Sequence, residues 1–217
     1  MPDFELRAAL SPIFSVPLIR HRWPQSEDLN NALADLFLAE ERTEAGITRS
    51  NVGGWHSDEG IFARDDAALG QLRARILLIL RRLLADNAQP REDSRVQFGL
   101  SGWANVTRPG GYNCAHDHGD FDWAGVYYVT AGDPPDAAAP LSGLFEFIDP
   151  RAGASGTTLA GQCFAPNWRI QPEPGLMLIF PGWLKHLVHP YRGTAPRISI
   201  AFNITLRPES RQALRRL

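Results

Sequence analysis

The sequence has few of the features that mark secreted, membrane-spanning and nucleic-acid-binding proteins. Its 217 residues include two cysteines, Cys114 and Cys163, too few for the disulfide framework of a small secreted domain, and we expect both to be reduced thiols. No uninterrupted apolar run approaches the roughly 18 residues that a membrane-spanning helix requires. The formal net charge of −2 gives no reason to expect a polyanionic partner such as nucleic acid. The N-terminus lacks the basic start and apolar run of a signal peptide. These absences predict a cytoplasmic protein without a membrane or nucleic-acid partner, and they leave a homodimer open.

What the sequence does contain is the composition of one globular domain. Hydrophobic residues make up 44% of the chain and charged residues 21%, which are ordinary values, and the length suffices for a single well-buried core. No repeat, low-complexity tract or clear linker divides it. We therefore expect one domain over residues 1–217, with a helical part over about 1–95 and a β-rich part over about 96–206.

Apolar residues recur at helical spacing in two segments of the N-terminal part. The first segment runs from about residue 26 to 42, with Ser26 as a candidate N-cap, and the second from about 66 to 86. Their apolar stripes are Leu29, Leu33, Leu36 and Phe37, and Leu69, Leu72, Ile76, Ile79, Leu80 and Leu83. We expect both stripes to be packing faces.

From about residue 96 onward the pattern changes to short strands broken by Gly and Pro clusters. The expected strands are 96–107, 123–130, 143–148, 175–180, 186–191 and 197–206. Turn signals separate them, among them Pro109-Gly110-Gly111 and Asp149-Pro150. Many short strands with regular turns predict a mainly β fold, a sandwich, jelly roll or barrel, with the helices packed on one outer sheet.

Four of the six histidines lie in two short segments of the β-rich part. In an extended strand, residues two apart point to the same face with Cα atoms about 6.5–7 Å apart, so His116 and His118 can converge on one metal ion. His186 is the candidate third ligand from a distant strand, whereas His189, three residues later, should point to the opposite face. Cys114 shares a face with His116 and leaves a Cys-His-His zinc site open, although a small buried side chain is the expectation.

Arg197 opens an alternating strand eleven residues after His186. Arg197, Ser199 and Ala201 share one face of this strand, which could present a guanidinium and a hydroxyl to a carboxylate. The alternative is a surface arginine at a strand end.

These motifs, taken in order, resemble the signature of the Fe(II)/2-oxoglutarate dioxygenases, and in particular a bacterial and phage branch whose function is uncharacterised. The resembling segments are 50–57 (SNVGGWHS), 103–106 (WANV), 125–129 (GVYYV), 147–151 (FIDPR), 180–186 (FPGWLKH) and 197–203 (RISIAFN). The resemblance implies a double-stranded β-helix, a jelly-roll variant. It also implies Fe(II) as the metal and 2-oxoglutarate as a cosubstrate, which is decarboxylated to succinate while an unidentified substrate, a small molecule or a macromolecule, is oxidised by dioxygen.

Carried over by position, His116 and His186 match the first and the distal iron ligands of that family. Arg197 and Ser199 match the residues that bind the far carboxylate of 2-oxoglutarate, and Tyr128 matches a strand tyrosine that assists them. The sequence departs from the wider superfamily at His118, where an acidic ligand is usual. We expect His118 to fill that position, since imidazole also suits iron, with Asp117 or Asp120 as alternatives.

Two other classes remain open at this point. A cupin-like metal protein that does not use 2-oxoglutarate would keep the histidines but would have no reason to turn Arg197 and Ser199 toward the metal. A metal-free binding module would not bring the three histidines together.

Overall fold

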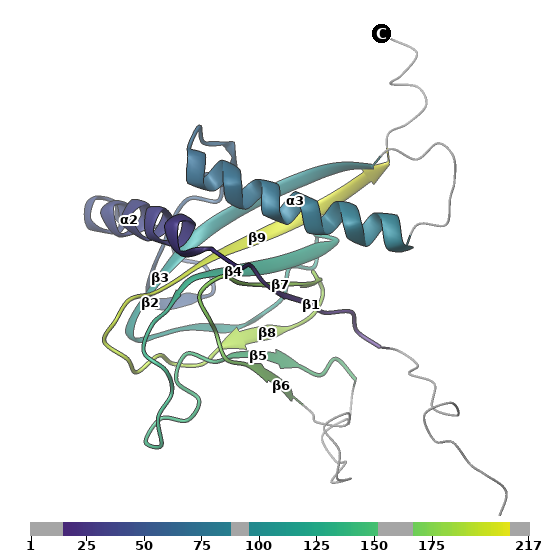
Figure 1. Cartoon of the computed structure of the whole chain (residues 1–217). Helices are drawn as coiled ribbons and strands as arrows, with labels where there is room; N and C mark the ends of the chain where they lie inside the picture. Colours follow the sequence, from purple (N-terminus) through teal and green to yellow (C-terminus); the bar gives the residue numbers. More distant parts are fainter. Residues whose placement is uncertain (1–14, 88–95, 152–166, 209–217) are drawn as a thin grey trace, which may run out of the picture.

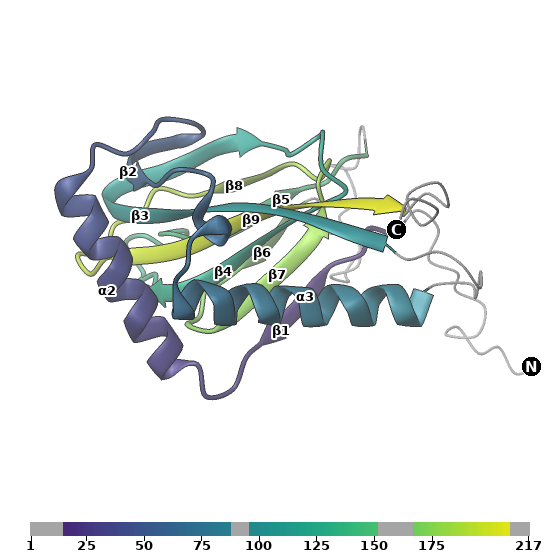
Figure 2. The ribbon, with the colours of Figure 1, turned by 90° about the horizontal axis from the view of Figure 1, so that it is seen from above.

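The computed structural model describes residues 15–87, 96–151 and 167–208, in which two helices cover one face of a curled sheet (Figure 1). Helix α2 spans Glu27–Thr43 and helix α3 spans Ala67–Asn87, with the short 3-10 helix η1 at Ile61–Ala63 between them. Both helices therefore lie within one or two residues of the predicted ranges. Ser26 does precede α2, but its side chain makes no capping hydrogen bond. Seen from above, α2 and α3 cross the same layer of strands (Figure 2).

Nine strands form the sheet in the described part of the chain. They are β1 (Ile19–Arg22), β2 (Asn51–His56), β3 (Val96–His116), β4 (Trp123–Ala131), β5 (Phe145–Ile148), β6 (Asn167–Ile170), β7 (Leu176–Pro181), β8 (His186–Val188) and β9 (Arg197–Pro208). Their hydrogen-bonded order is β1-β7-β4-β9-β3-β8-β5-β6, and β2 pairs with β3. The strands β8, β5 and β6 lie beneath the helix-covered layer (Figure 1), so the sheet curls on itself in the predicted jelly-roll arrangement.

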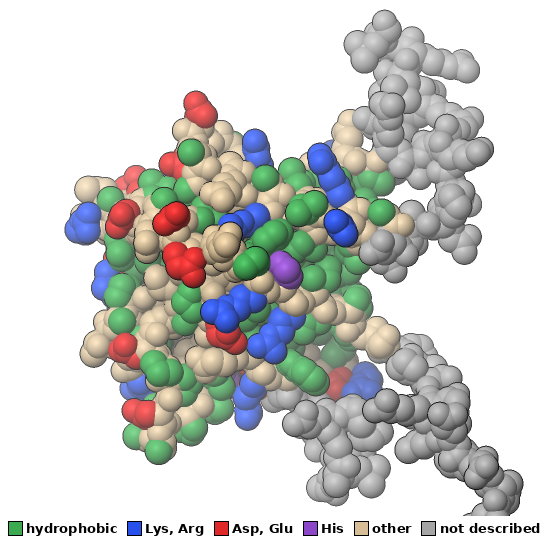
Figure 3. Space-filling model, in the orientation of Figure 1, with side chains coloured by type: hydrophobic (Ala, Val, Ile, Leu, Met, Phe, Trp, Pro, Cys, Tyr) green, Lys and Arg blue, Asp and Glu red, His purple; other side chains and the backbone are tan. Residues whose placement is uncertain are grey.

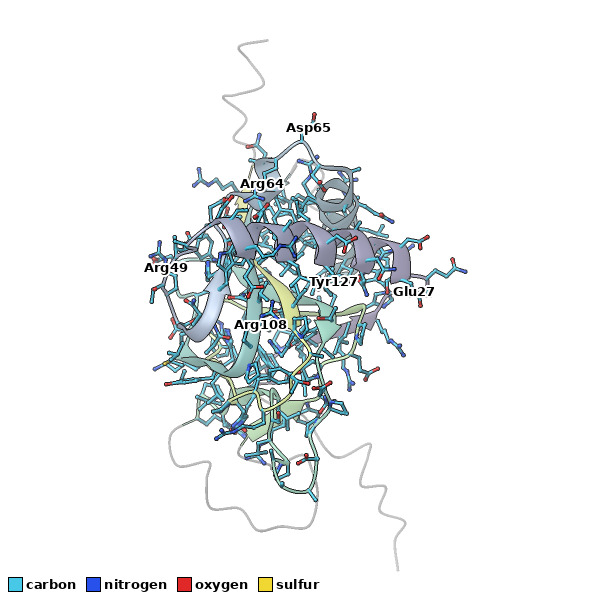
Figure 4. All side chains as sticks on the ribbon, turned by 90° about the vertical axis from the view of Figure 1, so that its left-hand side faces the viewer. Glu27, Arg49, Arg64, Asp65, Arg108 and Tyr127 are labelled. Carbon is cyan, nitrogen blue, oxygen red and sulfur yellow. The ribbon has the colours of Figure 1, made fainter. Side chains whose placement is uncertain are left out.

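Strand alternation divides the apolar side chains into two cores. On β4 and β9, residues such as Tyr127 and Ile200 pack with the helices, whereas Val126 and Tyr128 belong to a second cluster between the two layers. Figure 4 shows Tyr127 between the helices and the sheet, where its hydroxyl donates to Asn30 Oδ1 at 2.6 Å. Because successive residues face opposite sides, the polar residues of β9 turn toward the inter-layer space.

The predicted turn at Pro109-Gly110-Gly111 is wrong, because β3 continues through it. The strand bends there instead: Gly110 has φ +88°, its N–H donates to Tyr191 O at 2.6 Å, and Tyr191 N donates to Gly111 O at 2.9 Å. The bend lets one strand pair with β9 in the large layer and then with β8 in the small layer. Residues of β3 on both sides of the bend thus reach the same inter-layer space.

Short strands were the hardest to place from sequence. The predicted strand 186–191 ends at Val188 and the strand 143–148 begins at Phe145, while β1, β2 and β6 were not predicted. No helix among the described residues is long and apolar enough to cross a membrane. On the face seen in Figure 3, acidic and basic side chains alternate with hydrophobic ones, and neither sign dominates.

Candidate active site

Three histidine side chains come together at the open end of the inter-layer space. His116 is the last residue of β3, His118 follows two residues later outside the strand, and His186 begins β8, where it pairs directly with His116. One ligand nitrogen from each lies within 4.8 Å of the other two, and in the described part of the chain this is the one cluster of potential metal ligands. The ring centroids are 4.4 to 5.2 Å apart.

Backbone carbonyls fix the tautomer of two of these rings. Nδ1 of His116 lies 2.7 Å from Cys114 O, and Nδ1 of His186 lies 2.8 Å from Leu184 O. Because a carbonyl oxygen can only accept, Nδ1 carries the proton in the neutral ring and Nε2 keeps its lone pair. Nε2 is therefore the nitrogen available to a metal ion.

The environment keeps all three rings neutral. Burial lowers the pKa of His186 to about 3 and that of His118 to about 4, with further lowering by the charge of neighbouring His116. Burial also lowers the pKa of His116, and this outweighs the opposing effects of the Cys114 carbonyl and of Asp117. Neutral imidazoles are the form that binds metal, so the cluster is ready for an ion at neutral pH.

The other candidate ligands lie elsewhere. Asp117 and Asp120 are exposed and outside the cluster, and Asp117 accepts a hydrogen bond from Gly119 N in its own turn. Cys114 is exposed, contrary to the expectation of a small buried side chain, because a bulge between Asn113 and His116 breaks the two-residue alternation. Cys163 lies outside the described residues.

His189 does point away from the cluster, as the alternation predicts, and its Nε2 pairs with buried Glu146 at 2.8 Å.

A pocket extends inward from the three histidines and encloses about 460 Å³, including space open to solvent. Tyr128, Arg197 and Ser199, the three residues expected to bind the cosubstrate, all line it, and so does Asn105. Strand register brings these pocket residues together. Ser199 of β9 is paired with Tyr128 of β4 on one side and with Asn105 of β3 on the other. Phe145, Phe180 and Val188 form apolar parts of the wall.

Three polar atoms that line this pocket lack hydrogen-bond partners within the described structure. Arg197 is 1% exposed, yet its Nε has no hydrogen-bond partner and no described carboxylate forms an ion pair with it. The Tyr128 hydroxyl and Asn105 Oδ1 are likewise buried without a partner there. Although the guanidinium lies 5.3 Å from the centre of the Tyr128 ring, it makes no well-formed hydrogen bond to the hydroxyl. Burial lowers the pKa of Arg197 and raises that of Tyr128 to about 12.

Buried charges and polar groups are normally paired. A fixed cation and a neutral hydroxyl without partners, next to a cluster of metal-binding nitrogens, fit a ligand that carries a carboxylate. The residues present therefore suit both a divalent metal ion and 2-oxoglutarate.

The comparison with protein families gives the class that the chain resembles. Residues 101–203 match the model of the family described as "Putative 2OG-Fe(II) oxygenase". Over these 103 of its 217 residues the chain resembles the 2OG-Fe(II) oxygenases. This family gives iron and 2-oxoglutarate as the cofactor and cosubstrate, and the matched region contains the three histidines, Tyr128, Arg197 and Ser199. No curated protein matches the chain.

Solved structures share the fold of this chain at low sequence identity. A Pseudomonas putida prolyl-4-hydroxylase is 16% identical, with a TM-score of 0.58 over 89% of this chain and 94% of its own. A Trichoplax adhaerens prolyl hydroxylase in complex with a peptide fragment is 11% identical, with a TM-score of 0.57 over 87% and 83%. HygX from Streptomyces hygroscopicus, solved with nickel, 2-oxoglutarate and hygromycin B, is 14% identical, with a TM-score of 0.52 over 88% and 83%. These likenesses confirm the double-stranded β-helix.

Sequence reasoning left His56, Asn105 and Asn113 without a role and gave Trp103 as a core or pocket-lining residue. His56 is buried on β2 and its ring stacks on Trp103, with centroids 5.4 Å apart and planes 10° apart. Trp103 in turn stacks on His118. The signal was present in the segments SNVGGWHS and WANV, which register places side by side because His56 is paired with Asn105.

Proposed function

We propose that the protein is a 2OG-Fe(II) oxygenase, which holds Fe(II) on His116, His118 and His186 and anchors 2-oxoglutarate on Arg197, to hydroxylate a substrate that reaches the mouth of the pocket. The observation that carries this proposal is the unpaired, fully buried Arg197 in the same pocket as the histidine cluster. A metal protein without an acidic cosubstrate would gain nothing from an arginine kept out of water at this position.

Each polar group has a distinct task. Each of the three imidazoles would offer one nitrogen lone pair to the metal, from Nε2 in His116 and His186. The Arg197 guanidinium pairs with the far carboxylate of 2-oxoglutarate, and the Ser199 and Tyr128 hydroxyls donate hydrogen bonds to it, because each stands beside Arg197 on the pocket wall. Burial keeps the Tyr128 hydroxyl protonated far above neutral pH, so it remains a donor. When bound, Fe(II) and 2-oxoglutarate activate dioxygen, with release of succinate and carbon dioxide and oxidation of the substrate.

Apolar side chains form part of the wall of the pocket that contains the histidines and Arg197. Phe145, Phe180 and Val188 are among them, and water displaced from this wall by a bound ligand would strengthen the ion pair between Arg197 and that ligand. We place the protein in the cytoplasm, where the exposed thiol of Cys114 stays reduced. Its substrate is neither a membrane lipid nor a nucleic acid in this proposal.

An anaerobic titration tests the proposal directly. Fe(II) is added to the full chain under argon, followed by 2-oxoglutarate, and the metal-to-ligand charge-transfer band in the visible spectrum is recorded. We expect the band in the wild type and in His21→Ala, a control at an exposed histidine of β1, and its loss in His186→Ala. A wild type that binds Fe(II) but gives no band with 2-oxoglutarate would leave only a metal-binding protein.

A further inference from the structure

The three ligand rings are not held in the same way. His116 and His186 each donate Nδ1–H to a backbone carbonyl, which orients the ring as partners behind metal ligands commonly do. Within the described structure the ring of His118 has no such hydrogen bond. Its backbone is fixed, since His118 N donates to Gly182 O at 2.7 Å, but that bond leaves rotation of the imidazole about its side-chain bonds free.

Flat neighbours hold the His118 ring instead. The Trp103 indole stacks on it with centroids 5.8 Å apart and planes 28° apart, and the His186 ring stacks on it at 5.2 Å and 8°. Both neighbours lie nearly parallel to the His118 ring, so a ring that keeps this orientation retains both stacking contacts. Rotation of the His118 ring out of this orientation would lose them.

Trp103 is itself well supported. It lies on β3, paired with Ala201 of β9, and the buried ring of His56 covers it at 5.4 Å and 10°. Nδ1 of His56 lies 2.6 Å from Ser57 O, and Ser57 Oγ accepts a hydrogen bond from Ala104 N at 2.9 Å. These contacts join β2 to β3 beside Trp103, so the indole cannot easily move away from His118.

We propose that Trp103, backed by His56, is a positioning residue that sets the plane of the His118 ring so that its nitrogen meets the metal shared with His116 and His186. This inference rests on the proposed function, because it requires the three histidines to bind one ion. In this proposal ring stacking orients the His118 imidazole, as a backbone carbonyl orients the imidazoles of His116 and His186. Trp103 thus acts through His118 and not on the reacting atoms.

Metal affinity in the absence of substrate is the measurement that isolates this role. Co(II) suits imidazole ligands, and its visible ligand-field spectrum reports coordination geometry. We expect Trp103→Leu to weaken Co(II) binding by about 10- to 100-fold, the usual effect of removing a group that orients a metal ligand, and to alter the spectrum. Trp103→Phe keeps a flat ring and should stay within about threefold of the wild type. Trp168→Leu, at a half-exposed tryptophan of β6, is the matched control and should change neither quantity.

A double-mutant cycle separates positioning from a general effect on the fold. In a His118→Ala background, Trp103→Leu should cause no further loss of Co(II) affinity, because the ring on which Trp103 acts is gone. An equal further loss in that background would overturn the inference, and so would wild-type Co(II) affinity in Trp103→Leu, which would leave Trp103 as a pocket wall only. If Trp103→Leu does not fold, His56→Leu removes the support behind the indole and should weaken Co(II) binding by roughly threefold or more. Failure of the proposed function looks different: the wild type itself would show no Co(II) binding that His116→Ala abolishes.

Discussion

Arg197→Met separates the cosubstrate role of this arginine from a structural one. The substitution keeps an unbranched side chain of similar length and removes the charge. Two hydrogen bonds from the guanidinium to the far carboxylate of 2-oxoglutarate contribute about 1.5–3 kcal/mol each. Losing at least one of them weakens 2-oxoglutarate binding by at least about tenfold, and losing both by at least about 100-fold, since each 1.4 kcal/mol is a factor of ten. Metal affinity without 2-oxoglutarate should hardly change, because Arg197 is not a ligand.

The same variant makes an opposite prediction for the unliganded protein. Arg197 is 1% exposed and lacks an ion-pair partner among the described residues, so its desolvation is not compensated when the pocket is empty. Replacing such a buried charge with an apolar side chain is often neutral or stabilising, by about 1 kcal/mol or more. We therefore expect the melting temperature of Arg197→Met without 2-oxoglutarate to equal or exceed that of the wild type.

Thermal unfolding under argon with metal present measures both effects. At a 2-oxoglutarate concentration of 100 times the wild-type Kd, binding stabilises the wild type by about 2.7 kcal/mol, or roughly 5–10 °C for a chain of this size. A variant with a Kd 100-fold higher gains about 0.4 kcal/mol under the same conditions, or roughly 1 °C. Arg192→Met, at an exposed arginine of the preceding loop, is the control and should respond like the wild type. Equal shifts in Arg197→Met and the wild type would refute the reasoning and make Arg197 a structural residue.

Three further substitutions test other parts of the site and fold. His118→Asp restores the ligand type usual in related enzymes and should retain metal and some substrate-free turnover of 2-oxoglutarate, measured as succinate; complete loss of metal from a folded variant would remove His118 from the ligand set. Gly182→Ala places a Cβ against the carbonyl oxygens of Phe121 and His118. It should lower the free energy of unfolding by about 1–3 kcal/mol and weaken Co(II) binding. Unchanged values of both would contradict the tight approach of the two turns. Burial alone would raise the pKa of Glu146, but hydrogen bonds from Arg169 and His189 outweigh it and lower the pKa. Its stabilisation is therefore present above the unfolded pKa of about 4.3 and is lost as the pH falls through the lower folded value. The difference in melting temperature between the wild type and Glu146→Gln should disappear in that range, and a difference that persists there would exclude this carboxylate as its cause.

The sequence predicted the parts of the fold that repeat a simple period. Helix α2 buries the predicted Leu29, Leu33 and Phe37, because a 3.6-residue period needs only local information. Strand β9 alternates as predicted between apolar residues under the helices and Arg197 and Ser199 in the pocket. These elements are long enough for the pattern to be unambiguous.

The sequence-based predictions differ from the structure where tertiary contacts, and not the two-residue period of a strand, determine the backbone path. Gly110 looks like a turn residue, yet backbone hydrogen bonds with Tyr191 hold it in a bend within one strand. His118 was placed beside His116 by strand alternation, but it lies beyond the end of β3. Its place in the cluster comes from the hydrogen bond to Gly182 and from the Trp103 ring, neither of which a two-residue period contains.

The charges of the pocket residues indicate how an anionic cosubstrate would contribute to metal binding at an all-histidine site. The described residues that line it include Arg197 and no carboxylate, and the three histidines are neutral. A divalent ion bound there would find no anionic ligand from the cluster, in contrast to a site with an aspartate. In the proposed site the dianion of 2-oxoglutarate would then be the counter-charge for both the metal and Arg197, and at close range this attraction is strong. Because coupling between two ligands is reciprocal, 2-oxoglutarate must tighten the hold on the metal by the same factor by which the metal tightens the hold on 2-oxoglutarate. An all-histidine cluster beside an unpaired arginine therefore transfers to the cosubstrate the charge compensation that an acidic ligand would otherwise supply.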